Sequence, residues 1–86
     1  MYKGKRVLCI APCYNELHKI DRVVERMDRS VVDEVLVVDD GSNDGSPQAA
    51  EKLGATVIRL GKTLGVGVAI RTGIEYGAAN HFDILV

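Results

Sequence analysis

The chain has 86 residues, enough for one small domain, with 47% hydrophobic and 27% charged residues and a formal net charge of −1. This composition has no basic excess that would favour nucleic-acid binding and no acidic block that would form a solvated tail. The longest apolar run near the N-terminus, residues 7–11, is too short for the core of a signal peptide or for the about 20 residues of a membrane helix. We therefore expect a cytoplasmic protein without a transmembrane segment in this chain.

Four short apolar segments predict β-strands: residues 7–11 (VLCIA), 34–39 (EVLVVD), 56–60 (TVIRL) and 82–86 (FDILV). The first two are almost continuously apolar, which is typical of parallel strands that are buried on both faces. Cys9 and Cys13 are the only cysteines. Four residues along a strand span about 13 Å, beyond the about 7 Å that separates disulfide-bonded Cα atoms, so we expect two free thiols.

Three helical patterns lie between these strands. The first carries an apolar stripe formed by Leu17, Ile20, Val24 and Met27, with Asn15 as a candidate N-cap. The second is expected to begin with Ser46 as N-cap and Pro47 in the first turn, and to end near Gly54. The third spans about 67–79, where several glycines indicate close packing against the sheet. The alternating order predicts an α/β fold with a parallel sheet and right-handed crossovers.

Three unusual loops follow the first three strands: PCYNE (12–16), DDGSNDG (39–45) and GKTLGVG (61–67). Ligands of open parallel sheets bind outside the carboxyl ends of the strands, so these loops are expected to converge on one site. Tyr14 offers a ring face for a base. Glu16 and Asp40 can accept hydrogen bonds from a base N–H or a ribose hydroxyl. Gly65 and Gly67 would let backbone N–H groups approach an anion.

Other interpretations of these loops stay open at this stage. Asn15 and Glu16 can serve as helix caps, and the three aspartates can shape turns. Residues 40–51 also match the count of an EF-hand calcium loop, but a strand precedes them and Pro47 occupies the position that normally pairs in a β-bridge. The glycine segment lacks the third glycine of the dinucleotide fingerprint and the Gly-Lys-Ser/Thr ending of a Walker A loop.

The segments PCYNE, VLVVDDGSNDGS and GVGVAIRTG together resemble the N-terminal part of family-2 inverting glycosyltransferases with the Rossmann-like GT-A fold. The likeness is to polyprenyl-phosphate sugar transferases of the dolichyl-phosphate mannose synthase type, and it covers about residues 7–86. It implies a sheet of about four strands in the order 3-2-1-4 with helices on both faces. It also implies transfer of a sugar from a UDP- or GDP-sugar to a polyprenyl phosphate or glycan acceptor, for which the full enzyme can act at a membrane surface.

The resemblance assigns roles to individual residues. Pro12, Tyr14 and Glu16 match the loop that holds the nucleotide, and Val38 and Asp40 match the strand-end pair that contacts base and ribose. The last nucleotide-site match is Arg71, in a stretch that lines the donor pocket, whereas Asp39 has a more structural role. The chain departs from the family at residues 63–64, where an asparagine is frequent, and at Val66, where a lysine is frequent.

No catalytic or metal-binding residue is assigned in this chain. The family's D-x-D motif, which holds Mg²⁺ or Mn²⁺ on the donor diphosphate, would follow the fourth strand, so residues 1–86 are expected to be a donor-binding half without metal or transferase activity of its own. The alternative is a non-catalytic nucleotide-binding or interaction module. Because the fourth strand would expose an apolar edge, we also expect a homodimer through that edge.

Overall fold

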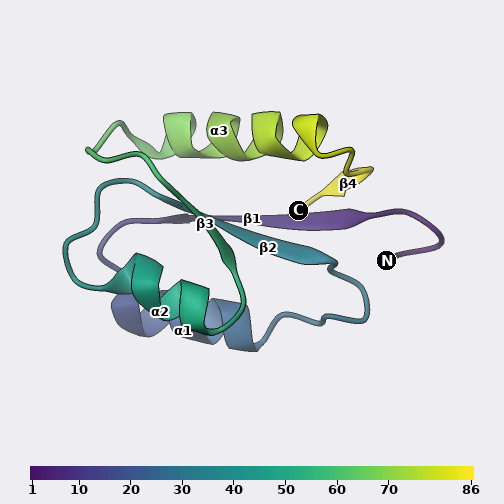
Figure 1. The fold of residues 1–86 in the computed structure, drawn as a ribbon, viewed down its shortest axis with the longest axis horizontal. Helices are drawn as coiled ribbons and strands as arrows, with labels where there is room; N and C mark the ends of the chain where they lie inside the picture. Colours follow the sequence, from purple (N-terminus) through teal and green to yellow (C-terminus); the bar gives the residue numbers. More distant parts are fainter.

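A computed structural model describes all 86 residues, as seven elements that alternate along the chain (Figure 1). The elements are β1 (Val7–Cys13), α1 (Leu17–Glu25), β2 (Glu34–Asp39), α2 (Ser46–Lys52), β3 (Thr56–Arg59), α3 (Val66–Ala79) and β4 (Ile84–Leu85). Each predicted element is present. The bounds of β2 agree with the predicted range, whereas β4 has two residues instead of five. None of the helices combines the length and hydropathy needed to cross a bilayer.

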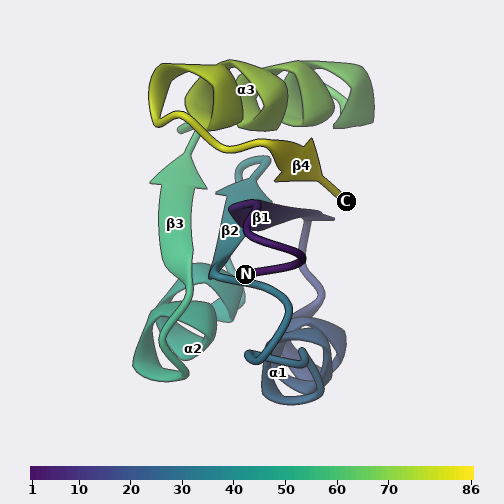
Figure 2. The same cartoon turned by 90° about the vertical axis from the view of Figure 1, so that its right-hand side faces the viewer.

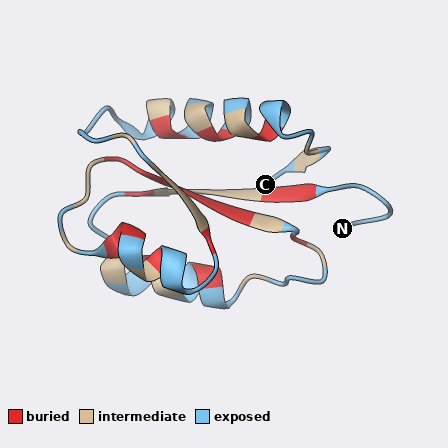
Figure 3. Cartoon of the chain, in the orientation of Figure 1, coloured by how far each residue is buried: buried red, intermediate tan, exposed pale blue.

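The four strands form one parallel sheet in the order β3-β2-β1-β4, which confirms the predicted α/β fold. Figure 2 shows the layers: α3 covers one face of the sheet, and α1 and α2 cover the other. Both faces of the central strands are therefore covered by helices, and Figure 3 shows β2 mostly buried and β1 buried toward its ends. This burial explains why β1 and β2 are rich in apolar residues without strict alternation.

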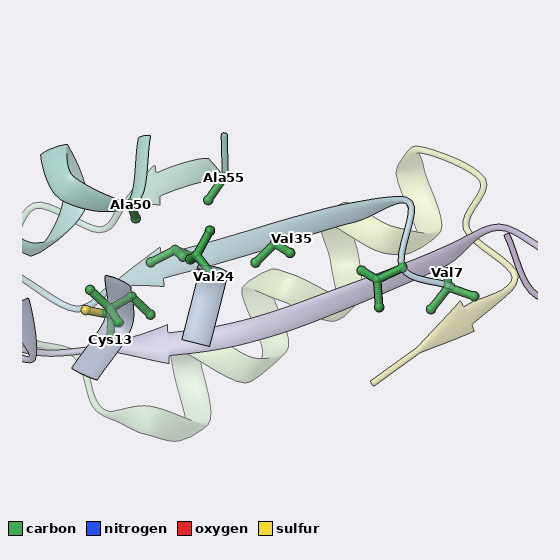
Figure 4. Packing of buried hydrophobic residues seen from close by; sticks show 9 residues of the cluster. Val7, Cys13, Val24, Val35, Ala50 and Ala55 are labelled. Atoms are coloured by element: carbon green, nitrogen blue, oxygen red, sulfur yellow. The ribbon is translucent and has the colours of Figure 1, made fainter. Parts of the chain in front are cut away.

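Side chains of β2 alternate between two hydrophobic clusters, as the two-residue period of a strand requires. Val35 and Val37 belong to the cluster under α1 and α2, whose buried residues Figure 4 shows. Leu36 and Val38 belong to the cluster under α3. All four side chains are fully buried. The strand β2 is thus the centre of the core, and its polar carboxyl end is paired with the end of β1.

The starts of the first two helices differ from prediction. Asn15 has a positive φ of 48° and precedes the N-cap of α1, which is Glu16 and makes no side-chain capping bond. The amides at this helix start bind tertiary partners instead, because Ser46 Oγ and Asp44 Oδ2 accept from the N–H groups of Glu16 and Leu17. In α2, Gly45 is the N-cap and Ser46 is the first helical residue, so the helix begins one position earlier than predicted.

The third helix packs a row of small residues against the sheet. Ala69, Gly73 and Gly77 are its buried residues, whereas its larger apolar residues Val66, Ile70 and Ile74 are exposed. A Cβ at Gly73 would lie 2.4 Å from Ile10 Cγ2, and one at Gly77 would lie 2.6 Å from Leu85 Cδ2. The predicted close packing of the glycines against the sheet is therefore confirmed.

We expect Gly73→Ala to lower the free energy of unfolding by about 1–3 kcal/mol, because the added methyl group overpacks the contact with the β-branched Ile10. Gly67→Ala is the matched control, since no atom lies within 4 Å of its Cβ position. That substitution should stabilise α3 by about 0.5–1 kcal/mol through helix propensity. Urea unfolding of both variants measures the difference, and equal effects would contradict the packing of α3.

Candidate functional site

The loops that follow β1, β2 and β3 leave the sheet at one edge, at the left in Figure 1. A pocket of about 320 Å³ lies at this edge. It is lined by Pro12, Cys13, Tyr14, Glu16, Asp40, Val66 and Ala69. The pocket therefore occupies the place where parallel sheets bind ligands, outside the carboxyl ends of the strands.

Four of the six residues predicted for the nucleotide site line this pocket: Pro12, Tyr14, Glu16 and Asp40. The other two do not. Val38 is fully buried in the cluster under α3, because the alternation of β2 turns its side chain into the core. Arg71 is exposed on α3 and lines none of the pockets of the chain.

The prediction omitted three lining residues: Cys13, Val66 and Ala69. Cys13 is the residue between Pro12 and Tyr14, so its place in the loop could have suggested it. Val66 and Ala69 are on the first turn of α3, and only the packing of that helix over β1 and β2 brings them to the pocket. Burial raises the pKa of the Cys13 thiol, which makes it a weak nucleophile at neutral pH.

The loop after β1 is held to the loop after β2 by hydrogen bonds in both directions. The Asn15 N–H donates to Ser42 Oγ over 2.8 Å, and Asn15 Oδ1 accepts from the Asn43 N–H over 2.9 Å. Glu16 is held in turn by the bond from its N–H to Ser46 Oγ, over 3.1 Å. These bonds fix the backbone beside Tyr14, whose side chain is 49% exposed. The ring is therefore available to a ligand.

Asp40 lies between the pocket and the loop that precedes α3. Asp40 is 7% exposed. Its two carboxylate oxygens accept hydrogen bonds from the Leu64 N–H over 2.6 Å and the Gly65 N–H over 3.0 Å. The Gly65 amide, predicted to approach an anionic ligand, thus binds a carboxylate of the protein itself. Each carboxylate oxygen has a second lone pair that a ligand N–H or hydroxyl can use.

Asp39, the neighbouring carboxylate, is turned into the fold. It is 2% exposed, its Oδ2 accepts from the Ser42 N–H over 2.9 Å, and its Oδ1 has no hydrogen-bond partner. The bond to Ser42 shapes the turn after β2, which agrees with the structural role implied for this residue.

The acidic loop 39–45 does not gather its carboxylates around one point. Asp40 binds the backbone of residues 64–65, whereas Asp44 accepts from the N–H groups of Leu17 and Ser46 and from the Ser46 hydroxyl. No group of three or more His, Cys, Asp or Glu side chains in the chain is arranged to hold a metal ion. These residues therefore do not fit a divalent cation, and no chemical step is assigned to one here.

Asp44 is expected to make the protein more sensitive to acid. Its hydrogen bond with the Ser46 hydroxyl, aided by the N–H groups of Ser46 and Leu17, holds the pKa of this carboxyl below its usual value. A lowered folded-state pKa gives stability that is present above the unfolded pKa of about 3.9 and is lost as pH falls through the folded value. Asp44→Asn should therefore be less stable than the parent at pH 7 and lose less stability between pH 5 and 2. Urea unfolding across that range measures this, and parallel curves would contradict it.

Comparison with known proteins gives one family for this chain. The family model described as glycosyl transferase family 2 matches residues 8–81. The chain is 36% identical to an undecaprenyl-phosphate mannosyltransferase of Micrococcus luteus, over 94% of this chain and 36% of that protein. It is 32% identical to a polyprenol monophosphomannose synthase of Mycolicibacterium smegmatis, over 95% of this chain and 34% of that protein. The chain thus spans about a third of the length of these relatives.

Solved structures give the same result. A glucosyl-3-phosphoglycerate synthase of Mycobacterium tuberculosis, crystallised with Mn²⁺, UDP and glucosyl-3-phosphoglycerate, superposes with a TM-score of 0.74 at 26% identity. The match covers 96% of this chain and 33% of that one. A mannosyl-3-phosphoglycerate synthase of Rubrobacter xylanophilus shares the fold, with a TM-score of 0.74 at 24% identity over 83% of this chain and 26% of that one. Together with the family match over residues 8–81, the sheet order and the strand-end pocket, this shows that the chain belongs to glycosyl transferase family 2.

Proposed function

We propose that the pocket at the ends of β1 and β2 binds the nucleoside of a UDP- or GDP-sugar donor. The observation that carries this proposal is the convergence of Tyr14, Glu16 and Asp40 on one pocket of about 320 Å³. This volume is at the small end of ligand sites, and it suits one nucleoside better than a whole nucleotide sugar. The pocket therefore serves the base and ribose, and the sugar lies beyond it.

The lining of the pocket suits a neutral, hydrogen-bonding ligand. The half-exposed ring of Tyr14 offers a face for stacking, and the carboxylates of Glu16 and Asp40 accept hydrogen bonds from base N–H groups and ribose hydroxyls. No lysine or arginine lines the pocket. Two carboxylates without a cation repel a diphosphate, so the phosphates are directed away from this pocket.

A reaction for the whole protein is proposed from the same family membership. We propose an inverting transfer of a sugar to a polyprenyl phosphate or glycan acceptor, supported by the mannosyltransferase relatives that are named for such lipids. A divalent metal, Mg²⁺ or Mn²⁺, is part of this proposal, supported by the Mn²⁺ and UDP crystallised in the related synthase. The free thiols of Cys9 and Cys13 support a reducing compartment, the cytoplasm, as its place of action.

We propose further that residues 1–86 by themselves bind nucleotide without transferring sugar. They span about a third of the relatives' length, and their carboxylates do not form a metal cluster. Incubation with UDP- or GDP-sugars, Mn²⁺ and a polyprenyl phosphate should leave the acceptor unmodified. Transfer above the level without protein would overturn this part of the proposal.

Calorimetric titration with UDP and GDP tests the nucleoside site. We expect one of them to bind weakly, with a dissociation constant of about 1 mM, because few ligand atoms are buried in so small a site. Tyr14→Ala should weaken binding about tenfold through the lost stacking, at about 1.4 kcal/mol. Tyr2→Ala is the matched control, since Tyr2 is similarly exposed (46%) and does not line the pocket. Equal affinities of the two variants would overturn the site.

The edge strand β4 supports the predicted homodimer, which stays a proposal. Its pairing with β1 leaves its other edge without a partner strand, and a pocket of about 300 Å³ beside it is mostly apolar. This pocket is lined by Ile10, Pro12, Ile70, Ile74, Leu85 and Val86. Exposed apolar edges pair with other chains.

Sedimentation of two lysine variants tests the dimer. Leu85 and Leu53 are each 37% exposed, but only Leu85 belongs to the β4 edge. Leu85→Lys should give monomers at concentrations where the parent and Leu53→Lys form dimers, because a charge on an edge strand opposes pairing. A parent that sediments as a monomer at millimolar concentration would contradict the proposal.

A further inference from the structure

The loop between β3 and α3, residues 61–65, depends on Asp40 for its attachment to the sheet. The hydrogen bonds from the Leu64 and Gly65 N–H groups to the two oxygens of Asp40 are the only ones that join these five residues to a strand or strand end. Asp40 itself is fixed, because its N–H continues the β1–β2 pairing by donating to the Cys13 carbonyl over 2.8 Å. The carboxylate is therefore a fixed anchor for a loop that has no other hydrogen bond to the sheet.

This anchor determines where α3 begins. Gly65 is the N-cap of α3 and has φ 102° and ψ 156°, a conformation that only glycine adopts without strain. The next residue, Val66, and Ala69 one turn later form the α3 side of the strand-end pocket. The position of this wall thus follows from the backbone at Gly65, which the carboxylate holds directly.

We propose that Asp40 is a positioning residue: it holds the loop 61–65 and thereby places the α3 wall of the pocket before any ligand arrives. This inference rests on the proposed nucleoside site for its effect on binding, but the attachment itself exists without a ligand. A carboxylate presents two acceptor oxygens to the two N–H groups, whereas an asparagine presents one oxygen and one NH₂ group. In Asp40→Asn, the N–H group of either Leu64 or Gly65 therefore faces the NH₂ group of the asparagine and has no acceptor.

The same geometry links the loop to the ligand. Asp40 lines the pocket with the carboxylate that it also presents to Leu64 and Gly65. A bound ligand would use the remaining lone pairs of the Asp40 carboxylate, while the loop uses the others. The ligand and the loop then each favour the carboxylate orientation that the other needs. Nucleotide binding should accordingly slow exchange of the Leu64 and Gly65 amide hydrogens, and loosening of the loop should weaken nucleotide binding by the same factor.

Amide hydrogen exchange of the ligand-free protein, followed by NMR, tests the attachment directly. Asp40→Asn should speed exchange of the Leu64 and Gly65 amides at least tenfold and leave the core amides of β2 unchanged. Glu16→Gln is the matched control, because Glu16 is also an acid of the pocket but makes no bond to the loop. In that variant, exchange at Leu64 and Gly65 should equal the parent's.

A second variant separates positioning from ligand contact. Gly65→Ala disturbs the loop through its positive φ without removing any acid, and a Cβ there meets no atom within 4 Å. It should weaken binding of UDP or GDP at least tenfold, as Asp40→Asn does. Faster exchange of the β2 amides in Asp40→Asn would mean that this variant loosens the whole fold. In that case the nucleotide affinity of Gly65→Ala decides the proposal, and weaker binding supports it.

The outcomes distinguish this inference from the proposed function. Unchanged exchange at Leu64 and Gly65 in a folded Asp40→Asn variant would overturn the attachment, even if nucleotide binding were lost. Unchanged nucleotide affinity in Gly65→Ala would overturn the positioning role. Faster exchange in Asp40→Asn together with no nucleotide binding by the parent would leave the attachment intact and refute the nucleoside site instead.

Discussion

Gly41→Ala is expected to lower the free energy of unfolding by about 2–5 kcal/mol, the sum of backbone strain and overpacking. Gly41 has φ 89°, and a Cβ there would lie 2.9 Å from both the Lys62 carbonyl carbon and the Thr63 nitrogen. These are backbone atoms of the loop that Asp40 holds, so the loop must move. Nucleotide affinity should therefore fall together with stability.

Gly45→Ala is the matched control for this prediction. Gly45 has a similar φ of 87°, but no atom lies within 4 Å of its Cβ position. Backbone strain alone should lower its free energy of unfolding, by about 1–2 kcal/mol, and its affinity for nucleotide should equal the parent's. Urea unfolding and calorimetric titration of both variants separate strain from the contact with the loop. Equal losses of unfolding free energy and of nucleotide affinity in the two variants would show that a Cβ at residue 41 does not displace the loop.

Leu36→Ala is expected to lower the free energy of unfolding by about 2–5 kcal/mol, because it leaves a cavity at the centre of the sheet. Leu36 is 0% exposed and belongs to the cluster under α3 with Leu8, Val38 and Ala69. A chain of this length has a total stability of about 4–13 kcal/mol. The substitution is thus expected to remove a large share of the fold's stability and to unfold the protein within the physiological temperature range.

Leu53→Ala supplies the comparison for Leu36→Ala. Leu53 is 37% exposed at the end of α2 and belongs to neither hydrophobic cluster. Its removal should cost about 0.5 kcal/mol or less. Thermal unfolding followed by circular dichroism measures both variants. A Leu36→Ala protein as stable as Leu53→Ala would mean that β2 is not the centre of the core.

Much of the fold is predictable from the sequence because its physical signals are local. The β2 segment EVLVVD is a short, β-branched run between polar residues, and its predicted bounds agree with the structure. The alternation of strands and helices requires a parallel sheet, which brings three loops to one edge. That constraint is enough to place Pro12, Tyr14, Glu16 and Asp40 around one pocket.

The remaining features depend on contacts between distant segments. The face of α3 that meets the sheet is its row of small residues, because only glycine and alanine leave room for Ile10 and Leu85; hydrophobicity alone favours the exposed Ile70 and Ile74. Val38 reaches the core because β2 is covered on both faces. The bonds of Asp40 to Leu64 and Gly65 join residues 24 and 25 positions apart, and no local pattern indicates them.

The central claim is that a nucleoside binds at the carboxyl ends of β1 and β2, and an NMR titration of the backbone amides with UDP and GDP tests it most directly. We predict saturable shift changes at Tyr14, Glu16 and Asp40 and at Val66 on the facing wall. The amides of Lys52 and Asn80, which lie outside the pocket, should not change. Shift changes confined to other surfaces, or none at millimolar concentrations of both nucleotides, would contradict the claim.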